Sequence, residues 1–126
     1  MSRDQILIVE DEIDGLDVVT RLLNAKGVKA MPFDNAETAW ERLNAEPERF
    51  RVAIIDLALP GIDGFELMQL IRGNSIFADV ALIAITAYHT SELKVKALDS
   101  GFDAYFEKPL NHINFLKTVM GFAPIL

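Results

Sequence analysis

Hydrophobic and polar positions divide the chain into two kinds of segment. Short aliphatic runs predict five strands, at residues 6–10, 28–33, 52–56, 81–86 and 104–107. Between and after these runs, apolar residues recur three or four positions apart, which is the spacing of one helix face. Five such stripes predict five helices: Leu16, Val19 and Leu23; Ala36, Ala39, Trp40 and Leu43; Leu67, Met68 and Ile71; Leu93, Ala97 and Leu98; and Ile113, Leu116 and Met120.

The strand pattern predicts an open parallel sheet. The first, third and fourth runs are continuously apolar, as in strands covered on both faces. Pro32 cannot donate a ladder hydrogen bond, so the second strand is expected at one edge, and the short, partly polar fifth strand at the other. Alternating strands and helices need right-handed crossovers. We therefore predict an α/β fold, a doubly wound five-stranded parallel sheet of order 2-1-3-4-5 with helices on both faces.

Several residues are expected to begin, end or anchor these helices. Asn35 and Asp14 are candidate N-caps, because their side chains can accept bonds from the free amides of a first turn. Gly27 stands where a helix commonly ends. Trp40 lies on an apolar stripe and is expected in the core.

Composition narrows the class of protein. The 126 residues are 51% hydrophobic and 25% charged, which predicts one globular domain over residues 1–126 and excludes a disordered chain. No apolar run approaches the roughly 18 residues of a membrane span, so membrane insertion is not expected. The start of the chain lacks a secretory pattern, and there is no cysteine, which favours a cytoplasmic location. The net charge of −7, with scattered basic residues, argues against direct nucleic acid binding.

Polar side chains follow the predicted strands where each one ends. Glu10 and Asp11 follow the first strand, and Asp56 closes the third. Thr86 closes the fourth strand, and Lys108 follows the fifth. In the order 2-1-3-4-5 the chain reverses direction between strands one and three, which opens a crevice at their carboxyl ends. The sequence therefore predicts a site at this edge of the sheet.

The residue types at this edge suit phosphoryl chemistry. Three carboxylates supply hard oxygen ligands for Mg²⁺. Without a cation, each like-charge pair at 4 Å costs on the order of 4 kcal/mol at an effective dielectric near 20. With a cation, Asp56 can act as a nucleophile toward phosphorus and form an aspartyl phosphate. Lys108 and the Thr86 hydroxyl can then contact the phosphoryl oxygens.

The motifs "VEDE", "DLALPGIDG", "ITA" and "YFEKP" resemble the receiver domains of bacterial two-component response regulators, especially stand-alone receivers of the chemotaxis type. The resemblance covers essentially the whole chain and implies a flavodoxin-like fold. It also implies a role for each matching residue: Glu10 and Asp11 as the acidic metal-binding pair, Asp56 as phosphoacceptor and metal ligand, the Ala58 carbonyl as a further metal ligand, Thr86 as switch hydroxyl, Tyr105 as switch aromatic, and Lys108 as phosphate-binding lysine, joined to Pro109 by a cis peptide bond.

The resemblance implies a phosphorylation-switched signalling module. The phosphoryl group would come from a sensor histidine kinase or a histidine phosphotransfer protein, and Asp56 would accept it with Mg²⁺. The surface formed by the fourth helix, fifth strand and fifth helix would then change and control a downstream protein, which the sequence does not identify. Such a protein catalyses its own phosphorylation and slow dephosphorylation, so its standing as a conventional enzyme stays open.

Some residues depart from the family or have other interpretations. Glu10 replaces the more usual aspartate. Ala58 and Tyr88 occupy positions that border the hydrolytic water in the family, although Tyr88 could equally be a surface aromatic. His89 and His112 are interpreted as surface or capping residues.

Two other protein classes share part of this pattern but lack support at a specific position. A phosphatase of the haloacid dehalogenase type needs a second aspartate where this chain has Ala58. A flavin carrier needs a phosphate-cradling first loop, whereas "EDEIDG" would repel phosphate.

Overall fold

The computed structural model describes residues 5–122, which form five parallel strands and five α-helices. The strands are β1 (Gln5–Val9), β2 (Lys29–Phe33), β3 (Phe50–Asp56), β4 (Ala81–Thr86) and β5 (Ala104–Glu107). The helices are α1 (Ile13–Asn24), α2 (Ala36–Ala45), α3 (Gly64–Arg72), α4 (Ser91–Ser100) and α5 (His112–Phe122), with a short 3₁₀ turn at Ser75–Phe77. The strand order is β2-β1-β3-β4-β5, as predicted.

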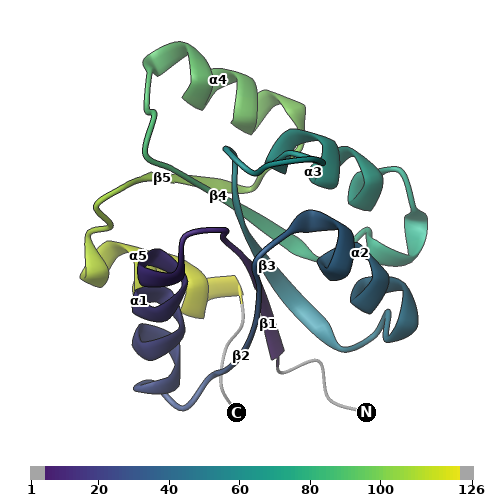
Figure 1. Ribbon diagram of the computed structural model, residues 1–126, viewed down its shortest axis with the longest axis horizontal. Helices are drawn as coiled ribbons and strands as arrows, with labels where there is room; N and C mark the ends of the chain where they lie inside the picture. The colour runs from purple at the N-terminus through teal and green to yellow at the C-terminus, as the bar shows by residue number, and fades with distance from the viewer. Residues whose placement is uncertain (1–4, 123–126) are drawn as a thin grey trace.

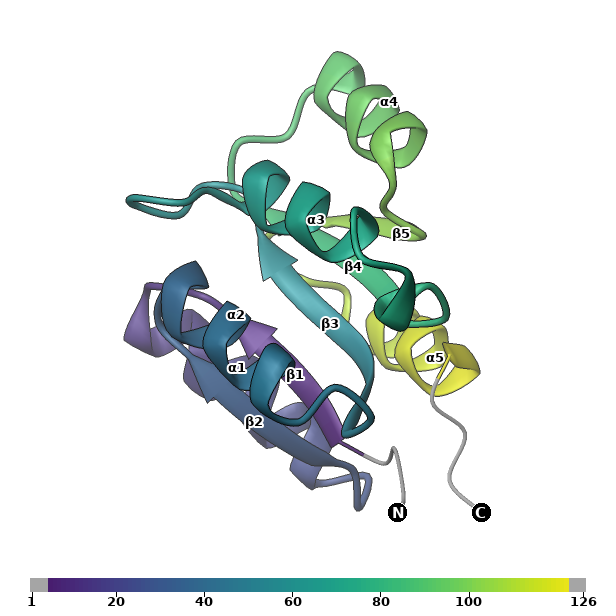
Figure 2. The ribbon, with the colours of Figure 1, turned by 90° about the vertical axis from the view of Figure 1, so that its right-hand side faces the viewer.

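Helices cover both faces of the sheet (Figures 1 and 2). On one face, α1 and α5 pack on strand residues such as Ile6, Ile8 and Ile54. On the other face, α2, α3 and α4 pack on the alternate residues, among them Leu7 and Ile55. Because successive strand residues point to opposite faces, the continuous apolar runs feed both cores at once. The sheet is therefore buried on both sides, and its carboxyl edge is left for polar residues.

The strand ranges and both edge strands agree with the sequence prediction. Pro32 lies on β2, whose free side faces no other strand in the described part of the chain. Asn35 caps α2, since its Oδ1 accepts a bond from the Thr38 amide at 2.8 Å. Gly27 adopts a positive φ of 75° two residues after the α1 C-cap, Ala25. A left-handed residue here lets the chain leave the helix and enter β2.

One helix prediction was wrong, and another was correct only in part. The cap position of α1 is Glu12, which makes no side-chain cap bond, and Asp14 lies inside the first turn instead. The predicted apolar stripe of α5 is correct only in part, because Leu116 and Met120 are partly buried against the core but Ile113 is not. The fully buried residues of this helix are Phe115 and Val119, whereas Ile113 is 79% exposed.

Trp40 is half-buried rather than fully buried. Its ring packs edge-on against Phe77, with the ring centroids 5.8 Å apart. Phe77 is completely buried and belongs to the core on the α2–α3–α4 face. Trp40 therefore closes the rim of that core, and the prediction of a core residue was correct only in part.

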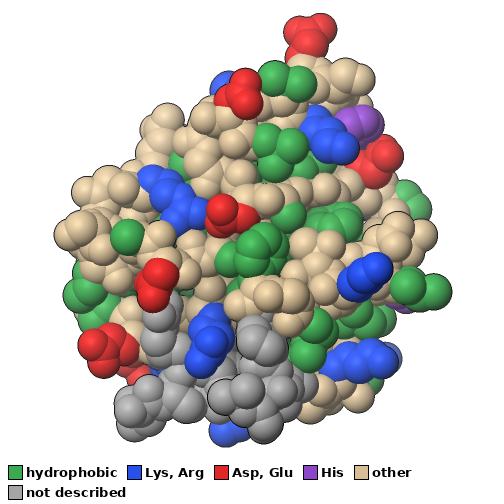
Figure 3. Space-filling view, turned by 180° about the vertical axis from the view of Figure 1, so that it is seen from behind, with side chains coloured by type: hydrophobic (Ala, Val, Ile, Leu, Met, Phe, Trp, Pro, Cys, Tyr) green, Lys and Arg blue, Asp and Glu red, His purple; other side chains and the backbone are tan. Residues whose placement is uncertain are grey.

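No helix in residues 5–122 is long and apolar enough to cross a bilayer. On the surface seen in Figure 3, acidic, basic and hydrophobic side chains are interspersed, so no large basic patch lies on this side of the molecule.

Candidate functional site

The four predicted polar strand ends meet at the carboxyl edge of the sheet. Asp56 is the last residue of β3, and Thr86 is the last residue of β4. Glu10 and Lys108 each come directly after their strands, β1 and β5. Parallel register fixes this alignment, because Val9 pairs with Ile55 and the next residues, Glu10 and Asp56, therefore lie on neighbouring strand ends.

Lys108 joins two of the carboxylates. Its Nζ donates a hydrogen bond to Oδ2 of Asp56 at 2.8 Å and another to Oε1 of Glu10. Both carboxylates are buried, whereas the lysine side chain keeps 19% of its surface exposed. Burial acts to lower the pKa of Lys108, but the bonds to Asp56 and Glu10 outweigh it and raise the pKa. The lysine is thus held as a cation at the site. The Lys108–Pro109 peptide bond that follows is cis.

Glu10 is the most strongly perturbed acid at the site. Burial, followed by the close Asp56 carboxylate, raises the pKa of Glu10 from 4.5 to about 7, although Lys108 opposes the rise. Among the described residues, Oε2 of Glu10 is also the one buried side-chain polar atom without a hydrogen-bond partner. A buried acceptor without a donor or cation is costly. Glu10 is therefore short of one positive contact.

The acidic residues form a cluster that fits a divalent cation. Glu10, Asp11 and Asp56 each offer one carboxylate oxygen, and these oxygens lie within 4.8 Å of one another. Asp11 is exposed, so the cluster opens to solvent on one side. Hard carboxylate oxygens are the ligands that Mg²⁺ prefers, and Mg²⁺ usually keeps several waters, which an open side permits. The unpartnered Oε2 of Glu10 supports the same fit.

The loop after β3 folds back over Asp56. The amide of Ala58 donates to Oδ1 of Asp56 at 2.9 Å, which fixes the carboxylate from the side opposite Lys108. Gly61 turns the loop with a φ of 69°. Asp63 then starts α3 with a capping box, in which its side chain accepts from the Glu66 amide at 2.9 Å. Gly64 is required because a Cβ there would collide with the backbone of Asp56.

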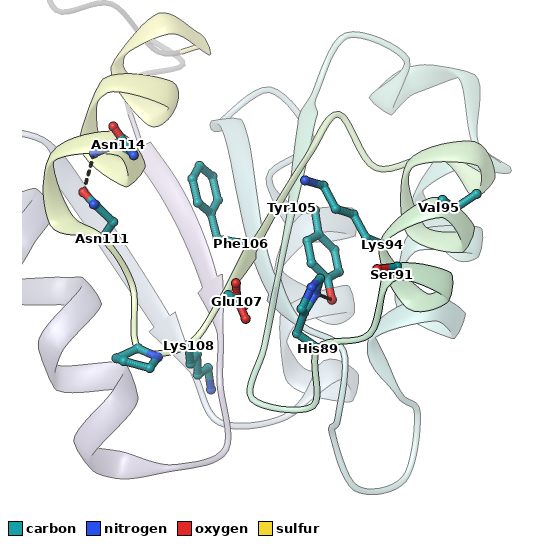
Figure 4. Close-up of a pocket in the computed structure, with 11 residues that line it drawn as sticks. His89, Ser91, Lys94, Val95, Tyr105, Phe106, Glu107, Lys108, Asn111 and Asn114 are labelled. Atoms are coloured by element: carbon teal, nitrogen blue, oxygen red, sulfur yellow. Dashed lines mark hydrogen bonds between the residues drawn. The ribbon is translucent and has the colours of Figure 1, made fainter.

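The two predicted switch residues both bond to the loop between β4 and α4. Oγ1 of Thr86 accepts from the Tyr88 amide at 3.0 Å. The hydroxyl of Tyr105 pairs with Nδ1 of His89 at 2.9 Å, and Figure 4 shows the two rings side by side. Burial, followed by the nearby Glu107, raises the pKa of Tyr105, so its hydroxyl stays protonated. Residues 88–89 therefore hold both switch residues in the present arrangement.

Tyr105 and His89 line a surface cavity of about 800 Å³. The cavity lies between α4 and α5, over β5, and Lys94 and Asn114 stand on its opposite walls (Figure 4). Lys108 also lines it. Lys108, which directly follows β5, thus contacts the acidic cluster and also lines this cavity.

Sequence reasoning missed the role of His89. The interpretation as a surface or capping residue was correct for exposure, but its partner Tyr105 is 16 positions away. No sequence motif joins the two residues, and they meet because the loop after β4 lies beside β5. Tyr88 is 73% exposed, which agrees with its interpretation as a surface aromatic.

The doubly wound fold and its acidic, lysine-bearing edge agree with the class of receiver domains that the sequence motifs resemble. Comparison with known families agrees: the response regulator receiver domain profile matches residues 6–120, and the chain belongs to this family. It is therefore a receiver domain of the two-component signalling type.

Individual relatives cover nearly the whole chain. The response regulator RppA from Synechocystis is 37% identical over 108 residues, and the regulatory protein VanRc from Enterococcus gallinarum is 33% identical over 116 residues. These matches span 83% and 92% of this chain but only 44% and 48% of the relatives. The chain thus spans about half the length of these two regulators. A 14.6 kDa protein from Leptolyngbya boryana is 32% identical over 119 residues, and 89% of that relative is covered.

Solved structures share the fold. A CheY-like receiver domain protein from Methanospirillum hungatei is 29% identical, with a TM-score of 0.82 over 95% of this chain and 93% of its own. The chemotaxis protein CheY4 from Vibrio cholerae, at 24% identity, has a TM-score of 0.85 over 96% of this chain and 99% of its own. Receiver domains take phosphoryl groups from histidine kinases and typically bind Mg²⁺ at an acidic site.

Proposed function

We propose that this chain acts as one receiver domain, residues 1–126, and that Asp56 is its phosphoacceptor. The observation that carries the proposal is the set of bonds on Asp56. One carboxylate oxygen is bound to the Ala58 amide and the other to the Lys108 ammonium. The carboxylate is thereby held in one orientation, at a strand end beside an acidic cluster that opens to solvent.

The donor is proposed to be a phosphohistidine on a histidine kinase or phosphotransfer protein. A carboxylate oxygen of Asp56 attacks the phosphorus, the P–N bond to the imidazole breaks, and the histidine leaves with the electron pair of that bond. The product is an aspartyl phosphate. Slow hydrolysis by water would return Asp56 to the carboxylate.

Charge explains the metal requirement of this proposal. Three carboxylates and one lysine give the site a formal charge of −2, which opposes an approaching phosphoryl group. Mg²⁺ would be held by Glu10, Asp11, Asp56 and the Ala58 carbonyl, and it would supply positive charge to the phosphoryl oxygens. Lys108 would contact a phosphoryl oxygen from the other side, since it already lies 2.8 Å from Asp56.

The output is proposed to be a change in the surface made by α4, β5 and α5. Phosphorylation gives the Thr86 hydroxyl a charged acceptor that competes with its present position, where it accepts from the Tyr88 amide. Movement of Thr86 would alter the space beside β5, and Tyr105 would turn from His89 toward it. A downstream protein that binds the α4–β5–α5 surface would sense this change.

The test is phosphorylation by a small donor. Incubation with acetyl phosphate and Mg²⁺ should add one phosphoryl group, and mass spectrometry of peptides should locate it on Asp56. Asp56→Asn preserves the shape of the side chain but removes the nucleophile, so this variant should gain no adduct. Asp99→Asn, on the exposed side of α4, is the matched control and should be labelled like wild type. An adduct that persists in Asp56→Asn would refute the assignment.

A further inference from the structure

Gly15 has no backbone reason to be glycine. It is the third residue of α1, and its φ is not in the left-handed region, in contrast to Gly27, Gly61 and Gly101. Glycine weakens the interior of a helix, because it has more conformational freedom to lose on folding than alanine. The presence of glycine at this position therefore calls for an explanation outside the backbone.

The explanation lies in the side chain of Glu10. A Cβ built on Gly15 would lie 2.6 Å from Oε1 and 3.3 Å from Cδ of Glu10. The first distance is well inside ordinary contact, so the carboxylate would have to move by close to 1 Å. The same Oε1 accepts the hydrogen bond from Lys108. Alanine at position 15 would thus displace an oxygen that the lysine already holds.

Glu10 has little freedom to absorb that displacement. Its side chain is completely buried, and its other oxygen, Oε2, is enclosed without a hydrogen-bond partner. A cavity of about 380 Å³ lies beside Gly15, between α1 and the chain after β5, and Glu10 and Lys108 line it together with apolar residues such as Val18 and Leu110. Most of this lining is apolar, so a carboxylate that moved into the cavity would leave its present position in the acidic cluster and find few polar partners besides Lys108.

We propose that Gly15 is a positioning residue, whose missing side chain makes room for a glutamate in the acidic cluster. Aspartate at position 10 would be one methylene shorter, and its carboxylate would end farther from Gly15. Glu10 and Gly15 then act as a pair. The longer side chain of Glu10 can reach Lys108 and the acidic cluster because α1 has no Cβ atom at position 15. This inference rests on the proposed metal role of Glu10.

A double-mutant cycle tests the pair. The four proteins are wild type, Gly15→Ala, Glu10→Asp and the double variant, and the measurement is Mg²⁺ affinity by titration. Residues that orient metal ligands typically change metal affinity by about 10- to 100-fold when altered. We expect Gly15→Ala to weaken Mg²⁺ binding about tenfold when residue 10 is glutamate and less than twofold in the Glu10→Asp background. An equal effect of Gly15→Ala in both backgrounds, or no effect in either, would overturn the proposal.

A metal-free measurement separates this proposal from the proposed function. Urea unfolding in chelator-treated buffer reports the contact itself. In the Glu10→Asp background, Gly15→Ala should raise the urea midpoint, because alanine favours the helix. With Glu10 present, the same change should lower the midpoint or leave it unchanged. If wild type failed to bind Mg²⁺, the metal role of Glu10 would fall, yet this comparison would still decide whether Gly15 accommodates Glu10. Equal shifts in the two backgrounds would refute the contact.

Discussion

At the scale of single residues, Glu10 combines three properties that rarely occur together. It is fully buried, one of its oxygens lacks a hydrogen-bond partner, and its pKa is raised to about 7. Its ion pair with Lys108 does not offset the loss of water and the nearby Asp56 carboxylate. The metal-free site is therefore under electrostatic stress that protonation of Glu10 relieves.

This stress predicts a pH dependence of stability in metal-free buffer. Because the folded protein holds the Glu10 proton more tightly than the unfolded chain, the stabilising effect of that proton is complete below pH 4.5 and is lost as the pH rises to about 7. The loss in unfolding free energy is on the order of 3 kcal/mol, since each pKa unit corresponds to about 1.4 kcal/mol. Urea unfolding of wild type and Glu10→Gln across this range measures it. The Gln variant has no proton to lose, so its curve should be flatter; two parallel curves would contradict the prediction.

At the scale of elements, α5 separates what the sequence could predict from what it could not. The apolar stripe predicted that this helix exists, and in the structure its fully buried residues are Phe115 and Val119, which lie in the core beneath α1 and α5. In a helix with apolar residues on more than one side, periodicity alone does not select the buried face. The predicted stripe included Ile113, but this side chain is 79% exposed, because tertiary packing buries Phe115 and Val119 instead.

The observed face of α5 gives a direct test of packing. Phe115→Ala should lower the free energy of unfolding by about 3 to 5 kcal/mol, because it removes a fully buried ring that packs edge-on against Phe106. Ile113→Ala, two residues earlier on the exposed side, should change it by less than about 0.5 kcal/mol. Chemical denaturation of both variants makes the comparison. Similar losses in the two would mean that Ile113 also packs against the core, as the predicted stripe required.

The strands and the site show the opposite outcome to α5. Sheet order could be predicted because a proline and a short polar strand marked the edges, and the continuous runs marked the centre. The place of Glu10, Asp56 and Lys108 followed, since parallel strands end at one edge. The sequence could not reveal the His89–Tyr105 bond or the fit of Gly15 to Glu10. Both depend on side-chain directions set by tertiary packing, between residues with no shared motif.

At the scale of the whole molecule, the acidic cluster and the proposed output surface are built on different strands of the sheet. Asp56 closes β3, at the centre of the sheet, whereas Tyr105 lies on β5, at its edge. β4 separates them and contributes Thr86. Thr86 is the polar side chain at the end of β4 on this edge, and under the proposed function it would carry the signal across β4, whereas Lys108 contacts Asp56 and also lines the cavity at Tyr105.

This arrangement predicts that chemistry and signal can be uncoupled. Thr86→Ala should still accept phosphate at Asp56, but NMR shift changes around Tyr105 on phosphorylation should shrink sharply. A charge-assisted hydrogen bond of this kind contributes about 1.5 to 3 kcal/mol, enough to shift a two-state population by roughly ten- to a hundredfold. Thr38→Ala, on the exposed face of α2, is the control and should respond like wild type. Full-sized changes at Tyr105 in Thr86→Ala would assign the signal to another route.

The ion pair between Lys108 and Glu10 spans 98 residues of sequence. During synthesis, the ribosome therefore adds Glu10, Asp11 and Asp56 well before Lys108, the lysine that pairs with Glu10 and Asp56. Until β5 has docked on β4, a nascent or truncated chain carries Asp56 without its cation, in a pocket whose acids repel a phosphoryl group. Loop closure over such a length is costly until the intervening strands are in place. Under the proposed function, a chain that lacks β5 and Lys108 would therefore be a poor phosphoacceptor.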